Sequence, residues 1–293
     1  MQDESIEVVA IDSPNQDVPV IEEALAAAGL TPSSFSNLET GMATTFIVTD
    51  GRNEAENTAS DIRSFLESWL DMLSGPPEIS VRTMRKEDWA NSWKKNFHVF
   101  RASRRLVVKP SWEEYQASEG DIVIPIDPGM CFGTGYHGTT MACLQYLDSL
   151  AEKHGTMSFI DAGTGSGILS IGARLLGYNP VMAFDNDPQC VPTALDNLRL
   201  AGIDDVDVVC APLGGFRPPR PADVVVANIL CAVLIEQADD VIALARPEGY
   251  LVLSGILNEQ YGELKETFEA RGCQELGNVS IKEWKSGLFR RGK

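Results

Sequence analysis

The chain has 293 residues, of which 44% are hydrophobic, and this composition is typical of a globular protein with one large or two moderate domains. No apolar run approaches the ~20 residues of a membrane-spanning helix, and the polar start, Met1 to Ser5, does not resemble a signal peptide. A formal net charge of −18 argues against a broad nucleic-acid contact and favours a basic, lysine-rich partner, with solubility alone as a nearly equal explanation.

Residues 1–82 are predicted to form a small α/β domain. Strands are expected at 6–11, 44–48 and 79–84, and amphipathic helices at 20–30 and 57–73. This pattern indicates a β-α-β-β-α-β, ferredoxin-like fold in which one strand is indistinct. No catalytic constellation occurs in this segment, so we expect a recognition or packing module.

A linker helix is predicted over residues 83–100. Trp89, Trp93 and Phe97 recur every four residues, so one face of this helix would carry three aromatic rings. We expect that face to pack between two domains, and a platform for a ligand is the less favoured alternative.

A glycine-rich loop precedes the next predicted helix. Two short strands are expected at 105–109 and 121–126, and residues 126–140 then hold four glycines and a proline before a helix over 139–150. Four polar side chains crowd this helix start: Thr134, His137, Thr139 and Thr140. A lone histidine is usually structural, but the density of glycines and the neighbouring hydroxyl groups make a functional role of the cluster equally supported.

The chain is organised around a strand, a glycine-rich turn and a helix at residues 157–176. Asp161 lies at the carboxyl end of the strand, and Gly163, Gly165 and Gly167 follow at alternate positions. Glycine permits positive φ and lets a ligand lie against the backbone. The helix amino terminus behind the turn offers free N–H groups to a polar or anionic ligand.

A second strand, predicted at 181–185, ends in Asp185, which is 22 residues after Gly163. In nucleotide-binding doubly wound sheets an acid at about that distance accepts the ribose hydroxyls. The motif together with Asp185 therefore indicates a nucleoside-containing cofactor.

The alternation of strands and helices continues to the end of the chain. Strands are expected at 206–210, 222–227 and 250–254, helices at 188–200, 231–245 and 259–271, and an antiparallel pair at 275–282 and 284–290. Residues 101–293 are thus predicted to form one α/β domain around a seven-stranded, mostly parallel sheet, with its ligand at the carboxyl ends of the strands.

The spacing G-x-G-x-G differs from the dinucleotide fingerprint, whose third glycine comes one place later, and resembles the S-adenosylmethionine motif of class I methyltransferases. Within that class the chain resembles the family that methylates ribosomal large-subunit protein eleven. The matching motifs lie at Trp89 to His98, Pro110 to Trp112, Phe132 to Thr140, Asp161 to Leu169, Asp185 to Pro188, Val224 to Leu230 and Leu253 to Leu257. Gly138 and Thr164 depart from the family, which usually has proline and cysteine there.

The resemblance implies a Rossmann-like methyltransferase domain that moves methyl groups from S-adenosyl-L-methionine to lysine or N-terminal amines of that ribosomal protein. It implies substrate recognition by residues 1–82. The cofactor contacts it implies are Thr140, Gly163, Gly165, Gly167, Asp185 and Asn228, and the catalytic residues are Asn228, His137 and Thr134.

Asn228 ends a strand next to the expected cofactor. Nitrogen-methylating enzymes of this class often hold the amine with an asparagine oxygen there, but asparagine also commonly caps a helix. Its place in the sheet favours the amine role. A lysine amine must first lose its proton, and either His137 or water could receive it.

Six cysteines form no C-x-x-C pair, so we expect reduced core thiols, no metal site and a cytoplasmic protein. No direct nucleic-acid or membrane partner is expected, and the sequence does not define the oligomeric state, for which a monomer is our expectation. Two alternatives stay open: a methyltransferase-like protein that acts on another protein or without turnover, and a nicotinamide-dependent oxidoreductase, which the glycine spacing disfavours.

Overall fold

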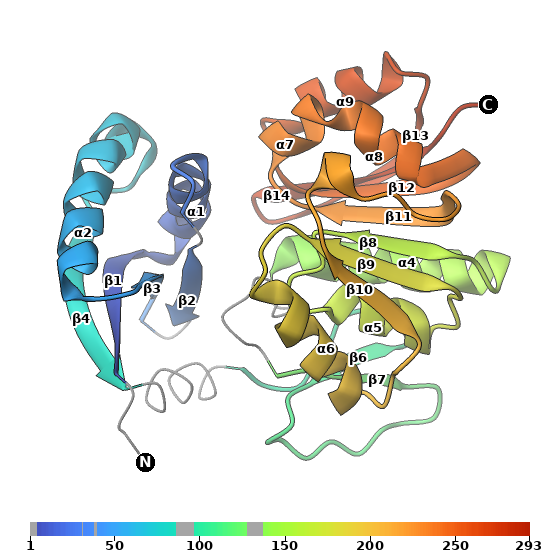
Figure 1. The fold of residues 1–293 in the computed structure, drawn as a ribbon, viewed down its shortest axis with the longest axis horizontal. Coiled ribbons are helices and arrows are strands. Elements are labelled where there is room, and N and C mark those ends of the chain that lie inside the picture. Colours follow the sequence, from blue (N-terminus) through green and yellow to red (C-terminus); the bar gives the residue numbers. More distant parts are fainter. Residues whose placement is uncertain (1–4, 31, 38–39, 86–96, 128–136) are drawn as a thin grey trace. The chain divides into compact units, whose positions relative to one another are not determined.

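The computed structural model describes residues 5–30, 32–37, 40–85, 97–127 and 137–293, in which the chain separates into two units, Met1–His98 and Val99–Lys293 (Figure 1). Neither end of the expected linker helix over 83–100 is helical: residues 83–85 continue strand β4, and Phe100 begins strand β5. Its central part, 86–96, lies outside the described residues.

The amino-terminal unit has the β-α-β-β-α-β order of a ferredoxin-like fold, which confirms the prediction. Its elements are β1 (Ser5–Pro14), η1 (Asn15–Asp17), α1 (Val18–Ala27), β2 (Ser33–Asn37), β3 (Met42–Thr49), α2 (Arg52–Leu66), η2 (Glu67–Met72) and β4 (Glu78–Arg85). The sheet order is β2-β3-β1-β4, and all three pairs are antiparallel. Helix α2 begins five residues earlier than expected, and it ends earlier because its last turns tighten into η2.

A seven-stranded sheet forms the centre of the second unit, as predicted. In spatial order its strands are β10 (Val206–Cys210), β9 (Val181–Asp185), β8 (Phe159–Ala162), β11 (Ala222–Asn228), β12 (Ala245–Leu257), β14 (Trp284–Arg290) and β13 (Gln274–Ile281). The pairs that β14 forms with β12 and β13 are antiparallel, and the other four pairs are parallel. The strand order reverses between β8 and β11, and sheets of this kind bind ligands beyond the carboxyl ends at such a point.

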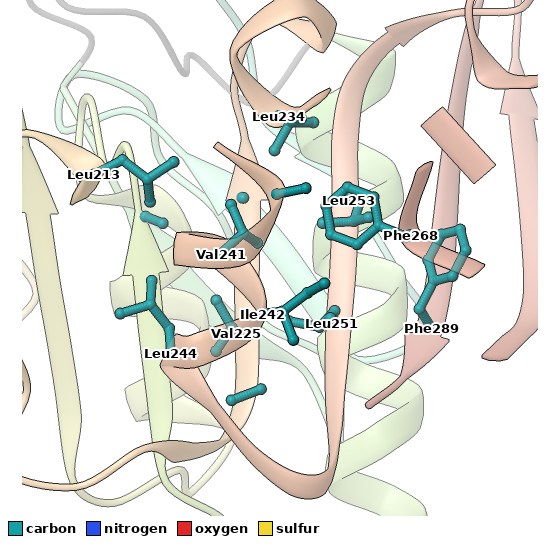
Figure 2. Packing of buried hydrophobic residues seen from close by; sticks show 14 of the residues in the cluster. Leu213, Val225, Leu234, Val241, Ile242, Leu244, Leu251, Leu253, Phe268 and Phe289 are labelled. Carbon is teal, nitrogen blue, oxygen red and sulfur yellow. The ribbon is translucent and has the colours of Figure 1, made fainter. Parts of the chain in front are cut away.

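Helices cover both faces of this sheet (Figure 1). They are α4 (Gly138–His154), α5 (Ile168–Leu175) and α6 (Cys190–Leu200) on one face, and α7 (Cys231–Glu236), α8 (Ala238–Leu244) and α9 (Tyr261–Glu269) on the other, with η3 (Leu213–Gly215) after β10. Figure 2 shows how side chains of α7, α8 and α9 pack on β11 and β12, with Leu234, Val241 and Phe268 against Leu253 and Val225. The helix expected over 231–245 is broken at Gln237, where φ is −107°.

A small third sheet joins β5 (Phe100–Arg101), β6 (Leu106–Lys109) and β7 (Ile122–Pro125) in that order. It packs on α5 at Gly172, where a β-carbon would lie 3.2 Å from Ile124 Cδ1. Within the described ranges no helix is long and apolar enough to cross a membrane. Five cysteines in those ranges are free thiols, and Cys210 is the exposed one.

The core of the seven-stranded sheet predicts a large effect of truncating Leu253. Its side chain is fully buried, so Leu253→Ala is expected to lower the free energy of unfolding by about 2–5 kcal/mol through lost burial and a residual cavity. Urea unfolding measures this. Leu276→Ala is the control because Leu276 is 46% exposed, and its change should stay within about 0.5 kcal/mol. Equal losses in both variants would contradict the packing described here.

Candidate functional site

The loop between β8 and α5 turns at three glycines with positive φ. The angles are 78° at Gly163, 53° at Gly165 and 84° at Gly167. The N–H groups of Gly163 and Thr164 both donate to the carbonyl oxygen of Phe184, at 2.9 and 3.0 Å, and this pins the loop to β9. All three predicted glycines therefore stand where the backbone needs left-handed conformations.

Gly167 also decides how closely two helices approach. A β-carbon there would lie 3.1 Å from the Cα and Cβ atoms of Ala194 in α6. The side-chain amide of Asn197 in α6 donates to the carbonyl oxygen of Ser166 at 2.8 Å and holds the same turn from beneath. The loop is thus supported from both β9 and α6.

Asp185, at the end of β9, is buried and faces the loop. Its Oδ2 accepts the N–H of Gly165 at 2.8 Å, and its Oδ1 accepts the N–H of Asp187 at 3.0 Å. Each carboxylate oxygen has two lone pairs, so each keeps capacity for a further donor. The carboxylate can therefore accept a pair of adjacent hydroxyl groups.

Asp161, one residue before the end of β8, is a fully buried carboxyl with two unlike oxygens. Its Oδ2 accepts the hydroxyl of Thr164 at 2.8 Å and both the N–H and the hydroxyl of Ser170, at 3.1 and 2.7 Å. Its Oδ1 is buried without a hydrogen-bond partner among the described residues. Burial raises the pKa of Asp161 to about 6, against the lowering effect of those hydrogen bonds.

Asn228 lies at the end of β11, and its side chain meets the first turn of α4. Its Nδ2 lies 3.4 Å from the hydroxyl oxygen of the buried Thr140, in a long hydrogen bond. Its Oδ1 is buried, and the described part of the chain supplies no donor to it. A buried amide oxygen without a donor is uncommon in folded proteins, and this one is able to accept a hydrogen bond from a ligand.

His137 lies directly before α4 and packs on the hairpin that ends the sheet. Its Nδ1 lies 2.7 Å from the hydroxyl oxygen of Thr139, and its ring meets that of Trp284 edge to face at 4.6 Å between centroids. Burial, and then the charge of Lys282, lower the pKa of His137 to about 4, so the ring is neutral at pH 7. The predicted catalytic residue Thr134 lies outside the described residues.

Sequence reasoning assigned no role to two residues that build this edge. Ser254 of β12 donates to the carbonyl oxygen of Thr139 at 3.2 Å and pairs with the Ser286 hydroxyl at 2.7 Å, which ties the start of α4 to the sheet. Gly255 has φ 85°, and a glycine inside an apolar strand is the signal that would have indicated it.

Together these groups form an acceptor-rich edge. The Oδ1 atoms of Asp161 and Asn228, which have no hydrogen-bond partner among the described residues, come from the adjacent strands β8 and β11, and Asp185 adds a carboxylate from β9. A ligand with N–H donors at one place and paired hydroxyls at another fits this set. No cluster of three or more His, Cys, Asp or Glu suited to a metal ion occurs in the described residues.

The strand order, the glycine loop after β8 and the carboxylate after β9 define a class I S-adenosylmethionine-dependent methyltransferase. The cofactor of that class carries ribose hydroxyls and an ammonium group, and both suit the acceptors on this edge.

Comparison with known proteins identifies the family. The family model "Ribosomal protein L11 methyltransferase (PrmA)" matches residues 15–291, and the chain belongs to this family. The ribosomal protein L11 methyltransferase of Citrifermentans bemidjiense is 43% identical over 233 residues, which cover 76% of this chain and 73% of that protein. That of Caldanaerobacter subterraneus is 38% identical over 245 residues, covering 83% and 76%. A crystal structure of ribosomal protein L11 methylase from Lactobacillus delbrueckii is 29% identical with a TM-score of 0.62, covering 67% of this chain and 100% of that one. The alternative that the chain is a nicotinamide-dependent oxidoreductase is not favoured by these comparisons.

The raised pKa of Asp161 predicts a specific pH dependence of stability. The folded chain binds this proton more tightly than the unfolded chain, whose carboxyl has the ordinary value of 3.8. The stabilising contribution is therefore complete below about pH 4 and is lost as the pH rises through about 6.

Asp161→Asn removes this charge and leaves an amide oxygen for Thr164 and Ser170. Its free energy of unfolding, relative to that of the unchanged chain, should rise by about 2–3 kcal/mol between pH 4 and pH 7.5. Urea unfolding of both proteins at the two pH values measures the difference, in which other titrating groups cancel. A difference that does not change with pH would show that Asp161 titrates normally.

Proposed function

We propose that this chain transfers methyl groups from S-adenosylmethionine to amines of ribosomal protein L11, at lysine side chains, the N-terminal amine or both. The relatives described above are named ribosomal protein L11 methyltransferases. The observation that carries the proposal is the buried Oδ1 of Asn228, which has no donor among the described residues. Asn228 is the last residue of β11, next to the strand that leads into the glycine loop. A neutral amine can donate one N–H to this oxygen and turn its lone pair toward the cofactor.

The cofactor contacts we propose come from three strand ends and α4. Asp185 accepts both ribose hydroxyls on the lone pairs that Gly165 and Asp187 leave open. The nucleoside lies against the backbone of the glycine loop near Gly165, because the open sides of Gly163 and Gly167 already face Ile229 and Ala194. Thr140 and Asn228 lie where the methionine part meets the amine. When bound, S-adenosylmethionine supplies a methyl group already activated by its sulfonium charge.

The chain's own task is then to present a neutral amine in line with that methyl group. With an ordinary pKa near 10.4, only about one lysine in 2,500 is neutral at pH 7, which costs roughly 4.6 kcal/mol. A partly desolvated site lowers this pKa. His137 is a poor proton acceptor because its own pKa is about 4. We therefore assign the proton to water and give His137 a positioning role at the start of α4.

Substrate selection is assigned to the amino-terminal unit. We propose that residues 1–82 bind and recognise the ribosomal protein and that residues 83–100 link this domain to the next. Residues 101–293 bind the cofactor and the reacting amine. The net charge of −18 favours a basic partner and speeds encounter with it. Because the proposed substrate is a ribosomal protein, we propose that the enzyme acts in the cytoplasm.

If Asn228 holds the amine, removing its side chain should slow methyl transfer much more than it weakens cofactor binding. Asn228→Ala removes the acceptor and the alignment it provides, so the rate of a single turnover should fall by about 100-fold or more. The affinity for S-adenosylmethionine, measured by calorimetric titration, should change much less. Asn278→Ala, on the exposed face of β13, is the control. Turnover within a few-fold of the control would reduce Asn228 to a structural residue.

If residues 1–82 recognise the protein substrate, their removal should abolish methylation of that substrate without weakening cofactor binding. A chain that begins at Val99 keeps every described residue of the site, so it should bind S-adenosylmethionine with the affinity of the full chain. It should lose methylation of intact ribosomal protein L11, because the unit that selects this substrate is missing. Quantitative methylation assays of both chains with the same protein substrate decide this. Methylation by the shortened chain at the full rate would overturn the recognition role.

A further inference from the structure

Ile229, the residue after Asn228, lies between two glycines, one in the loop after β8 and one within β12. Gly163 begins the cofactor loop after β8 with φ 78°, and Gly255 lies within β12 with φ 85°. The side chain of Ile229 faces the first glycine, and its backbone faces the second. This arrangement joins the residue proposed to hold the amine to the loop proposed to hold the cofactor.

The two contacts are too close for any other residue type. A β-carbon at Gly163 would lie 2.4 Å from Ile229 Cγ2, and one at Gly255 would lie 2.3 Å from the carbonyl oxygen of Ile229 and 2.9 Å from its carbonyl carbon. Real β-carbons essentially never approach other atoms below 3.0 Å. A side chain at either glycine would therefore collide with Ile229.

An irregularity in β12 creates the second contact. The pairing of β12 with β14 advances three residues along β12, from Leu253 to Ile256, but only two along β14, from Gly287 to Lys285. The extra residue forms a bulge at Ser254 and Gly255, and a left-handed glycine is one of the forms such a bulge takes. Asn228 still pairs with Ser254, so the close contact begins directly after the last paired residue of β11.

We propose that Ile229 is a positioning residue, a wedge between Gly163 and Gly255 that sets Asn228 in register with the cofactor loop. The proposal rests on the function proposed above, because it gives the Oδ1 of Asn228 its fixed place. It also identifies Gly255, far from the glycine motif in sequence, as a determinant of turnover. Partial burial of Ile229 against the α7–α9 side of the sheet holds the wedge in place.

Gly255→Ala tests the backbone side of the wedge. The new methyl group displaces the Ile229 carbonyl and with it Asn228, so single-turnover methylation at saturating S-adenosylmethionine should fall by about tenfold or more. Cofactor affinity, measured by calorimetry, should stay within about threefold of that of the unchanged chain. Gly272→Ala is the matched control, since Gly272 has φ 84° and a β-carbon there would meet nothing within 4 Å. Turnover equal to that of the control would overturn the proposal, as would an equal loss of turnover and affinity, which indicates general damage.

Gly163→Ala combined with Ile229→Ala tests the side-chain side, with affinity as its readout. The single variant Gly163→Ala should bind S-adenosylmethionine weakly, both because alanine rarely adopts φ 78° and because its methyl group collides with Ile229 Cγ2. Ile229→Ala removes that atom, so the double variant should bind several-fold more tightly than Gly163→Ala alone. Gly163→Ala with Ile229→Val, which keeps a γ-methyl group, should show no such recovery. Absence of recovery in the alanine pair would overturn the wedge.

These outcomes are distinguishable from failure of the proposed function. The double-variant experiment measures cofactor affinity and does not involve Asn228 as an amine acceptor. If Asn228→Ala kept full turnover while the alanine pair recovered affinity, the amine assignment would fall and the steric contact would stand. If Asn228→Ala lost turnover while Gly255→Ala did not, the amine assignment would stand and the positioning role would fall.

Discussion

Parallel pairing of β9, β8, β11 and β12 brings four strand ends to one edge of the sheet, and the whole candidate site depends on that register. Ala162 pairs with both Phe184 and Ala227, and Asn228 pairs with Ser254. Consequently the loop after β8 can bond to β9 while it touches the residue after β11. A slip of one residue would turn Asp161 and Asn228 to the opposite face of the sheet.

The arrangement of polar groups at this edge lowers the stability of the folded state. Asp161 and Asn228 each bury an oxygen without a partner among the described residues, although buried acceptors are ordinarily satisfied. Donors that hold one oxygen of Asp161 in place make the other available at a defined position. Such pre-organisation suits an enzyme whose cofactor already carries an activated group, because alignment is then the main catalytic task.

Local patterns in the sequence predicted the strands and the motif, but not the contacts between distant segments. The bounds of β9 and β10 agree with the prediction because turn residues enclose short apolar runs. By contrast, β2 has the sequence Ser-Ser-Phe-Ser-Asn, and pairing with β3 makes it a strand against weak propensity. The hydrogen bond from Gly165 to Asp185 agrees with their expected proximity, but nothing in the spacing indicates that Gly255 meets Ile229. Burial likewise sets the pKa of His137, which its place in a motif could not predict.

Intact-mass spectrometry of ribosomal protein L11, incubated with this chain and S-adenosylmethionine, tests the central claim most directly. We expect the mass to rise in whole methyl increments, and peptide fragments to place every methyl group on a lysine side chain or the N-terminal amine. The full chain carrying Asn228→Ala serves as the matched reference and should give a much slower increase. An unchanged mass, under conditions in which calorimetry shows S-adenosylmethionine bound to the chain, would contradict the account.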